Sequence, residues 1–267
     1  MKILALACFC VDVFPESGKV LPGGNALNLA VNCKLAGHEV FVMGNIGKDK
    51  YGEILKSSIC KYKLDCSKIY EIEGQTANHI IHIDKYGDRY FKDNAWTGGV
   101  WDKFKISEDD KSFIKNMDVL ATTVFEPDFE NIVKAGKAAK CLAVDFHDIK
   151  INSSHEKYFP LIDLFFISGK NQDSPEFRKY LKDQSEKYKT IFTATLGERG
   201  SIAYEKGKEY VCEALKAEKV TDTTGCGDSY QAGFITEYVS SKNIKKSMQK
   251  GSQFAAKTLS YVGGFEI

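Results

Sequence analysis

The chain contains 267 residues, of which 43% are hydrophobic and 27% are charged. Its 37 Lys and Arg residues nearly balance 36 Asp and Glu residues, which argues against a protein that coats nucleic acid or lies on a membrane surface. The 17 Phe and 13 Tyr residues exclude a disordered chain, and the length suits one or two domains with a large core.

Eight cysteines are spread along the chain without a C-x-x-C pair, which favours reduced, buried thiols over a disulfide framework or a metal site. The apolar N-terminal run has no small-residue cleavage site and is interrupted by Asp12, so it predicts a core strand rather than a signal peptide. No window approaches the roughly 20 apolar residues of a membrane helix. We therefore expect a cytoplasmic protein without membrane or nucleic-acid partners.

Apolar, β-rich runs alternate with segments of helical periodicity, which predicts a three-layer α/β/α fold around a mostly parallel sheet. Strands are predicted at Lys2–Val11, Val40–Gly44, Val119–Val124, Cys141–Phe146, Leu164–Ser168 and Thr190–Leu196. Helices are predicted at Ala26–Ala36, Tyr51–Tyr62, from Ser107 as N-cap, and at Pro127–Ala139, Ser174–Tyr188, Gly227–Ser240 and Ile244–Tyr261.

Two segments break this alternation, 13–21 and 76–94. The second has period-two patterning on both sides of Asp84–Asp88, which is typical of a hairpin. The hairpin could extend one edge of the sheet, or it could project as a lid over the carboxyl ends of the parallel strands. We expect a single α/β domain spanning residues 1–267, with a small β lid formed by these two segments.

The run Asp222-Thr-Thr-Gly-Cys-Gly-Asp228 precedes a predicted helix and carries the strongest chemical signal. Gly225 and Gly227 let the backbone turn tightly, and the free N–H groups of a helix start bind anions. Asp228 has two interpretations. It could simply stabilise the helix dipole, or it could accept a proton from a hydroxyl that attacks phosphorus, which the neighbouring Asp and Thr residues favour.

This run resembles the C-terminal signature of the ribokinase-like (pfkB) carbohydrate kinases, with Cys226 in place of the common Ala. Gly23-Gly-Asn-Ala-Leu-Asn28 resembles the N-terminal signature of the same family. Asp12 stands where that family keeps a hydroxyl-binding acid, and the run from Thr195 to Ser201 resembles its nucleotide-side turn. The matches keep the family's order from about residue 12 to residue 263.

The resemblance implies an ATP-dependent kinase that uses Mg²⁺ and, in some relatives, K⁺. Asp228 would be the base, and the N–H groups of Gly225, Cys226 and Gly227 would hold the transferring phosphoryl group. The implied nucleotide-binding residues are Thr195, Gly197, Gly200, Gly225 and Gly227. The implied monovalent-cation residues are Asp222 and Thr224.

One family motif departs from its usual form. Many relatives carry N-x-x-E, whose acid helps to organise Mg²⁺, and here Lys170 and Asp173 fall at those two positions. Asp173 could act on Mg²⁺ through water, while Lys170 could offset phosphate charge. Alternatively, this is a polar loop that enters a helix at Ser174-Pro175.

The acceptor side is predicted from Asp12, Gly23, Gly24, Asn25, Asn28, Arg89 and Asp93. Asp and Asn bind neighbouring hydroxyls well, although we expect one of the two asparagines to cap the following helix. Arg89, Tyr90 and Asp93, on the second hairpin strand, could reach over a bound ligand, or could simply lie in solvent.

Within the family, the local sequence features of this chain most resemble those of the bacterial fructoselysine 6-kinases. The grounds include Asp88-Arg89 followed by an aromatic pair, Asp145-Phe146 with a nearby lysine, and the absence of a D-x-N-x-R pattern. This implies 6-phosphorylation of a fructosamine, whose secondary amine Asp93 or Asp145 could bind. Asp145 could equally satisfy local backbone N–H groups.

Other acceptors remain open: a simple ketose, ribose, a 2-keto-3-deoxy acid or a nucleoside. A non-catalytic sugar or nucleotide sensor on the same scaffold is a remoter alternative, disfavoured by retention of Asp228. A dinucleotide-binding oxidoreductase is disfavoured because no G-x-G-x-x-G follows the first strand. The resemblance also implies a homodimer formed through the lid.

Overall fold

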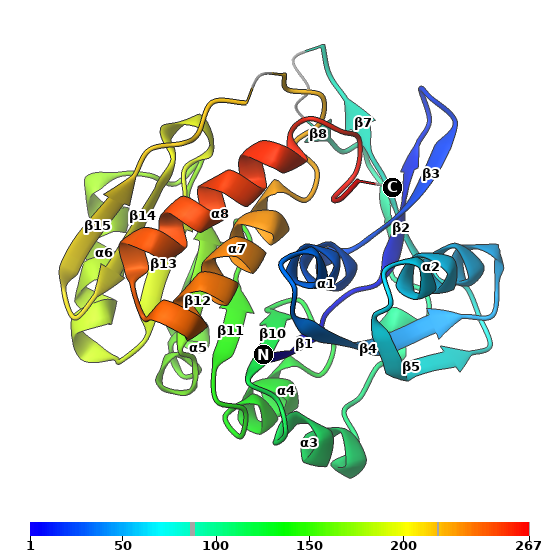
Figure 1. The fold of residues 1–267 in the computed structure, drawn as a ribbon, viewed down its shortest axis with the longest axis horizontal. Helices are drawn as coiled ribbons and strands as arrows, with labels where there is room; N and C mark the ends of the chain where they lie inside the picture. The colour runs from blue at the N-terminus through cyan, green and yellow to red at the C-terminus, as the bar shows by residue number, and fades with distance from the viewer. Residues whose placement is uncertain (86–88, 218, 267) are drawn as a thin grey trace.

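The structure is a computed structural model that describes residues 1–85, 89–217 and 219–266. A nine-stranded sheet in the order β15-β14-β13-β12-β11-β10-β1-β4-β5 forms its centre (Figure 1). Its parallel strands are β1 (Lys2–Leu6), β4 (Glu39–Gly47), β5 (Asp65–Ile72), β10 (Val119–Thr123), β11 (Leu142–Asp145), β12 (Leu164–Ser168) and β13 (Ile191–Thr195). Two antiparallel strands, β14 (Ser201–Glu205) and β15 (Lys208–Cys212), complete one edge.

The chain winds outward from β1 in both directions, since β1 pairs with β4 on one side and with β10 on the other. Sheets with this topology open a crevice at the carboxyl ends of the strands where the direction reverses. The segments that follow β1 and β10 are therefore the natural place for a site.

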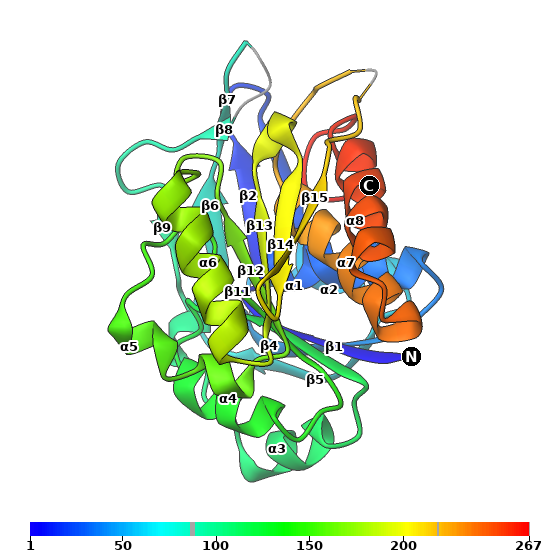
Figure 2. The same ribbon diagram turned by 90° about the vertical axis from the view of Figure 1, so that its left-hand side faces the viewer.

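Helices cover both faces of the sheet, which confirms the predicted three-layer α/β/α architecture (Figures 1 and 2). One layer contains α1 (Asn25–Leu35), α2 (Lys50–Lys61), α7 (Cys226–Ser241) and α8 (Ile244–Thr258). The other contains α3 (Glu108–Ile114), α4 (Phe129–Gly136), α5 (Ser153–Glu156) and α6 (Pro175–Lys187). Short 3₁₀ turns lie at Trp101–Lys103, Phe159–Leu161 and Gly197–Arg199.

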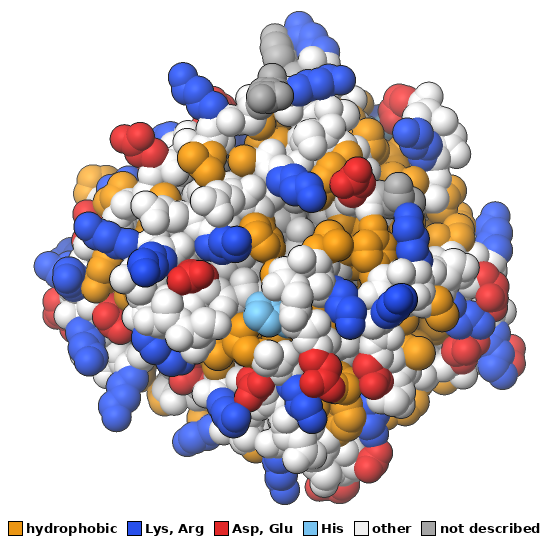
Figure 3. All heavy atoms as spheres, viewed as in Figure 1, with side chains coloured by type: hydrophobic (Ala, Val, Ile, Leu, Met, Phe, Trp, Pro, Cys, Tyr) orange, Lys and Arg blue, Asp and Glu red, His pale blue; other side chains and the backbone are white. Residues whose placement is uncertain are grey.

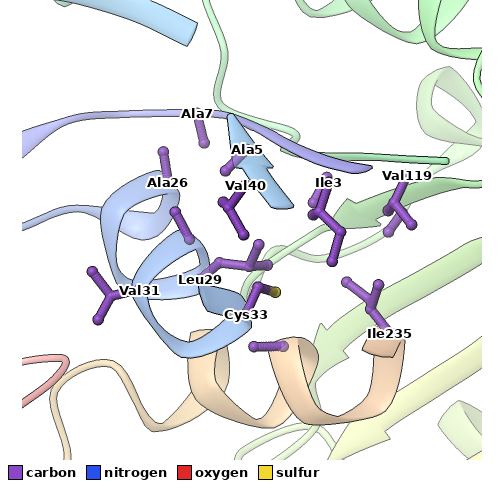
Figure 4. Close-up of a cluster of buried hydrophobic side chains, with 14 of the residues drawn as sticks. Ile3, Ala5, Ala7, Ala26, Leu29, Val31, Cys33, Val40, Val119 and Ile235 are labelled. Atoms are coloured by element: carbon purple, nitrogen blue, oxygen red, sulfur yellow. The ribbon is translucent and has the colours of Figure 1, made fainter. Parts of the chain in front are cut away.

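Alternation along β1 divides the core into two layers. Ile3 and Ala5 face the layer of α1 and α7, whereas Leu4 and Leu6 face the opposite layer. Figure 4 shows part of the first layer, where side chains from β1, β4 and β10 lie against those of α1 and α7. These buried residues fix α1 and α7 side by side, which positions the site described below.

Helix starts follow their predicted caps. The Ser107 hydroxyl accepts a hydrogen bond from the Asp110 N–H at 3.1 Å and begins α3. The Ser174 hydroxyl accepts one from the Phe177 N–H at 3.2 Å and begins α6, with Pro175 at the first helical position.

The expected single strand Lys2–Val11 is wrong, because the chain leaves the central sheet after Leu6. The Cys8 carbonyl accepts the N–H of Ala26 at 3.3 Å instead of bonding to a neighbouring strand. A second strand then begins in a second sheet. The uninterrupted apolar run hid this change because residues 7–11 are buried on both sides of the break.

The second sheet has the order β3-β2-β6-β9, with β2 (Cys10–Phe14), β3 (Lys19–Gly23), β6 (Ala77–Ile80) and β9 (Trp96–Thr97). The predicted hairpin contributes β6 and β9, and its outer part pairs β7 (His82–Ile83) with β8 (Arg89–Tyr90). It joins β2 rather than the nine-stranded sheet, so the interpretation as an edge extension is wrong. Part of its predicted turn, 86–88, lies outside the described residues.

Basic and acidic side chains are interleaved over the face shown in Figure 3. This agrees with the balanced charge of the sequence. Among the described residues, no helix is long and apolar enough to cross a membrane.

Candidate active site

Asp228 lies buried in the first turn of α7, and two amides of α1 hold its carboxylate. Asn25 Nδ2 donates to Oδ1 at 2.9 Å, and Asn28 Nδ2 donates to Oδ2 at 2.8 Å. Residues three apart on a helix share a face, so α1 presents both amides to α7. The expectation that one asparagine caps α1 is wrong, since the N-cap is Gly24 and has no side-chain cap bond.

Burial raises the pKa of Asp228, and the hydrogen bonds from Asn25 and Asn28 oppose that rise. The charge of Asp145 raises the pKa further, while that of His147 lowers it. The net direction is upward, so this carboxylate binds a proton more tightly than an ordinary aspartate. That property suits a general base, provided that the two amides keep it in its charged form at working pH.

The two glycines before Asp228 play different structural roles. Gly225 has φ +73°, and a Cβ there would lie 2.4 Å from the Cα of Gly264. A Cβ on Gly227 would meet nothing within 4 Å, so this side of the helix start is open. The N–H of Cys226 donates to the Thr223 carbonyl at 3.3 Å, so one of the three N–H groups predicted to hold the transferring phosphoryl group is already engaged.

Asp222 is fully buried, and its carboxylate holds the backbone of the loop that precedes α7. Its Oδ1 accepts the N–H of Thr224 and its Oδ2 accepts the N–H of Gly263, both at 2.8 Å. The Thr224 hydroxyl is buried and has no hydrogen-bond partner among the described residues. An orphaned oxygen beside a buried carboxylate fits a monovalent cation, which stays a prediction for these two residues.

Asp12 lies on β2 with its carboxylate buried against the glycine pair. A Cβ on Gly23 would lie 2.3 Å from Asp12 Oδ2, and Gly24 has φ +90° with no room for a Cβ beside the Cys8 carbonyl. Burial raises the pKa of Asp12 to about 7, although the charge of Arg89 opposes the rise. At neutral pH, Asp12 can therefore both accept from and donate to a hydroxyl.

Among the residues predicted for the acceptor side, Arg89 interacts electrostatically with Asp12, whereas Asp93 is exposed to solvent. The charge of Arg89, on β8, lowers the pKa of both Asp12 and Cys226 against the effect of burial. Asp93 is exposed between β8 and β9, and the described part of the chain gives its side chain no hydrogen bond. Its predicted role in binding the acceptor gains no support from this position.

Glu126 is a buried acid that sequence reasoning missed. Its Oε2 accepts from Trp101 Nε1 at 3.1 Å and its Oε1 from the Thr123 hydroxyl at 3.3 Å. Burial raises the pKa of Glu126 to about 8. Glu126 follows the end of β10 by three residues. An acid just past the end of an apolar strand was the sequence signal that could have identified it as a site residue.

Asp145 ends β11, and His147 lies two residues further along the chain. The His147 N–H donates to Asp145 Oδ1 at 2.9 Å, and His147 Nε2 lies 3.9 Å from Asp145 Oδ2. His147 has φ +52°, unusual for a residue other than glycine. The predicted local role of Asp145 toward backbone N–H groups is therefore observed, and its charge also acts on Asp228.

Asp173 is held in ion pairs with two arginines, and its water-mediated role toward Mg²⁺ stays a prediction. Its Oδ1 accepts from Arg178 Nε at 2.7 Å, and its Oδ2 accepts from both Arg178 and Arg199. The guanidinium groups lower its pKa and balance its charge. Among the described residues, no group of three or more His, Cys, Asp and Glu side chains is placed to hold a metal.

The predicted nucleotide-side turn lies between β13 and β14, at the edge of the sheet where the parallel strands end. Thr195 ends β13, and Gly197 and Gly200 have φ +63° and +89°. A Cβ on Gly200 would lie 2.0 Å from the Cys212 carbonyl oxygen, so the turn requires glycine there. The contact of these residues with a nucleotide stays a prediction.

Comparisons with known proteins agree with this geometry. Residues 13–266 match the pfkB family of carbohydrate kinases. A fructoselysine 6-kinase of Shigella flexneri is 31% identical over 266 residues, covering 99% of this chain and 100% of the relative. A fructosamine kinase of Bacillus subtilis is 28% identical over 267 residues, covering 99% and 93%.

The fold is also found in solved structures. Ribokinase of Arabidopsis thaliana, complexed with ribose and ATP, has a TM-score of 0.83 at 19% identity, covering 98% of this chain and 93% of that one. Fold, site and comparisons define a phosphotransferase with an alcohol group as acceptor. The chain belongs to the pfkB family of carbohydrate kinases, whose members use ATP.

Proposed function

We propose that this kinase transfers the γ-phosphoryl group of ATP to the 6-hydroxyl of fructoselysine. The observation that carries the transfer chemistry is the Asp228 carboxylate, held by Asn25 and Asn28 at the open start of α7. The similarity to the two fructosamine kinases over nearly the whole chain supports the acceptor.

In the proposed reaction, Asp228 accepts the proton of the acceptor hydroxyl as its oxygen bonds to the γ-phosphorus. The bond between that phosphorus and the bridging oxygen breaks, and ADP leaves. The N–H groups of Gly225 and Gly227 stabilise the charge on the transferring group, an effect worth roughly 3–4 kcal/mol per donor in comparable sites. The turn at Thr195, Gly197 and Gly200 would bind the nucleotide.

The family implies two ions, a monovalent cation and Mg²⁺. The structure offers candidate residues for the first but assigns no residue to the second. Asp222 and Thr224 would hold a monovalent cation, whose charge would favour anion binding in the adjacent loop. For Mg²⁺, the two arginines occupy most of the acceptor sites of the Asp173 carboxylate, so no step is assigned to it.

On the acceptor side, Asp12 and Glu126 provide two buried carboxyl groups. Such groups suit sugar hydroxyls and the secondary ammonium of a fructosamine. The second sheet, which carries Asp12, would close over the acceptor as a lid, and its outer hairpin would exclude water.

The test is an ADP-release assay with purified enzyme and a panel of acceptors: fructoselysine, psicoselysine, fructose, ribose, a 2-keto-3-deoxy acid and a nucleoside. We expect the highest kcat/KM for fructoselysine, with phosphorus NMR placing the phosphate on O6. Good turnover of a simple ketose with failure of every fructosamine would overturn the acceptor. Binding without turnover of any acceptor would favour a sensor.

A further inference from the structure

The face of the second sheet that carries Asp12 also carries an aromatic wall, formed by His79, Phe91 and Trp96. Directly paired residues on neighbouring strands point to one face, and Asp12 pairs with His79 as His79 pairs with Trp96. The rings of His79 and Phe91 are stacked, with centroids 4.3 Å apart. The Trp96 ring meets His79 edge-on at 5.6 Å.

The wall is ordered by its own contacts, yet much of it faces solvent. Phe91 is 46% exposed and Trp96 is 41% exposed. Large rings held in fixed positions and left uncovered beside buried acids are typical of a ligand surface. Tyr90, 44% exposed, instead stacks on His82, outside the wall.

The wall is connected to the acceptor site at one end and bordered by a cation. Trp101 meets Trp96 edge-on at 5.5 Å and donates to Glu126, one of the two buried acids. The Arg89 guanidinium carbon lies 5.6 Å from the Phe91 ring centroid. Burial and the charge of Arg89 lower the pKa of His79 to about 4, so its ring is neutral at working pH.

We propose that the aromatic wall binds the part of the acceptor beyond the sugar, namely the methylene chain of the lysine, with Arg89 binding the lysine carboxylate. This inference rests on the proposed function because it assigns a subsite for the same acceptor. The groups present match the groups of the ligand: acids for the sugar and its amine, rings for the methylene chain, and a cation for the carboxylate. A free hexose would leave the rings and Arg89 unused.

The test compares two acceptors that share the sugar, fructoselysine and 1-amino-1-deoxyfructose. In the full-length enzyme, Phe91→Ala should raise KM for fructoselysine by about tenfold, the loss expected for about 1.4 kcal/mol of binding. It should leave kcat, and KM for 1-amino-1-deoxyfructose, unchanged. Tyr90→Ala is the matched control, because it removes an equally exposed ring outside the wall, and it should change neither KM.

Arg89→Met tests the carboxylate. It should raise KM for fructoselysine more than KM for the analogue made from 1,5-diaminopentane, which lacks that carboxylate. A binding readout without ATP is also at hand, because the chain has 2 Trp residues, Trp96 and Trp101. Their fluorescence should change more with fructoselysine than with 1-amino-1-deoxyfructose.

Each contrary outcome identifies what fails. If wild-type enzyme phosphorylates fructosamines but Phe91→Ala acts equally on both acceptors, or on neither, the wall is not a subsite. If wild type phosphorylates a simple ketose and no fructosamine, the proposed function fails as well. If Phe91→Ala dissociates a dimer without changing KM, the wall contacts a second copy of the chain. Phe91→Leu replaces the alanine variant if circular dichroism shows that the latter is unfolded.

Discussion

Asn28 and Asp228, separated by 200 residues in the chain, are joined by a hydrogen bond of 2.8 Å. With the matching bond from Asn25, this contact fixes the orientation of the carboxylate at the start of α7. It joins the two sequence signatures of the family into one functional unit. The proposed base therefore depends on both helices, because α7 supplies the carboxylate and α1 supplies the amides that orient it.

Replacing the base should separate binding from chemistry. We expect Asp228→Asn to lower kcat by at least 10²–10⁴-fold, the range for a lost general base, while the Kd for ATP changes little. Coupled ADP release and isothermal titration measure the two quantities. Turnover within tenfold of wild type would contradict the assignment of the base.

The amides of α1 should control the pH dependence. Asn25 and Asn28 lower the pKa of Asp228 against the effect of burial, so removing either donor raises that pKa. Since the base acts when deprotonated, the acidic limb of the kcat/KM profile should move to higher pH in Asn28→Ala. Loss of a hydrogen bond to a charged group, about 1.5–3 kcal/mol, predicts a roughly 10–100-fold drop on the acidic side.

Asn116→Ala serves as the control for this profile. Asn116 is exposed and its side chain bonds only to the Ser112 carbonyl among the described residues. An acidic limb that stays in place in Asn28→Ala would show that Asp228 does not govern it.

The glycines of the loop should respond in opposite ways to alanine. Gly225→Ala places a Cβ 2.4 Å from Gly264 at a positive φ, so we expect a lower melting temperature and loss of activity together. Gly227→Ala adds a Cβ to open space in the first turn of α7, where alanine is favoured by about 0.4–1 kcal/mol because it restricts the unfolded chain. It should keep or raise the melting temperature while reducing kcat, because that space is where the phosphoryl group would lie.

Thermal unfolding and ADP release, measured on the same preparations, test the pair. A destabilised Gly227→Ala, or a fully active one, would show that the open side of α7 has been misplaced.

Asp173 should matter for stability more than for metal binding. Its pKa is lowered by Arg178 and Arg199, so its contribution to stability is complete above the unfolded value of about 4 and is lost as pH falls through the lower folded value. Because both arginines are partly exposed, we expect Asp173→Asn to cost roughly 1–3 kcal/mol of unfolding free energy near pH 7. Urea unfolding at pH 7 and pH 3 measures this difference.

The kinetic counterpart is the dependence of activity on magnesium. With Asp173 committed to the two arginines, the Mg²⁺ concentration at half-maximal rate should stay the same in Asp173→Asn. A large increase would restore the metal role predicted from the sequence.

Cys226 should react slowly with thiol reagents despite its position in the loop. Burial raises the pKa of its thiol to about 12, so little thiolate exists at neutral pH, and thiolate is the reactive form. Mass spectrometry after iodoacetamide treatment should show Cys60 and Cys66, both exposed, modified well before Cys226. Early alkylation of Cys226 would mean that the loop is more open than described.

Local signals were enough to predict much of the fold. The caps at Ser107 and Ser174 and the glycine-rich start of α7 are set by residues adjacent in sequence. The division between β1 and β2 was missed, because both strands are apolar and the break depends on a contact between Cys8 and Ala26. Edge strands such as β15, whose residues are largely exposed, carried too little apolar patterning to be recognised.

The site was predicted in its residue types more than in its contacts. Motif order indicated Asp12, Asn25, Asn28 and Asp228, but the bonds between the asparagines and Asp228 depend on how α1 packs against α7. Glu126 was missed because its burial follows from Trp101, which comes from a separate part of the chain. The sequence left the role of Asp173 open between a water-mediated metal contact and a polar loop, because its arginine partners lie five and 26 residues away and carry no local signal.

Residues 263 and 264 pack against the loop that begins α7. Gly263 supplies an N–H to Asp222, Gly264 lies against Gly225, and Phe265 is buried against Tyr62. The support of the loop that begins α7 therefore comes from residues about 40 positions further along the chain, so a substitution at Phe265 should lower activity without removing any proposed ligand contact.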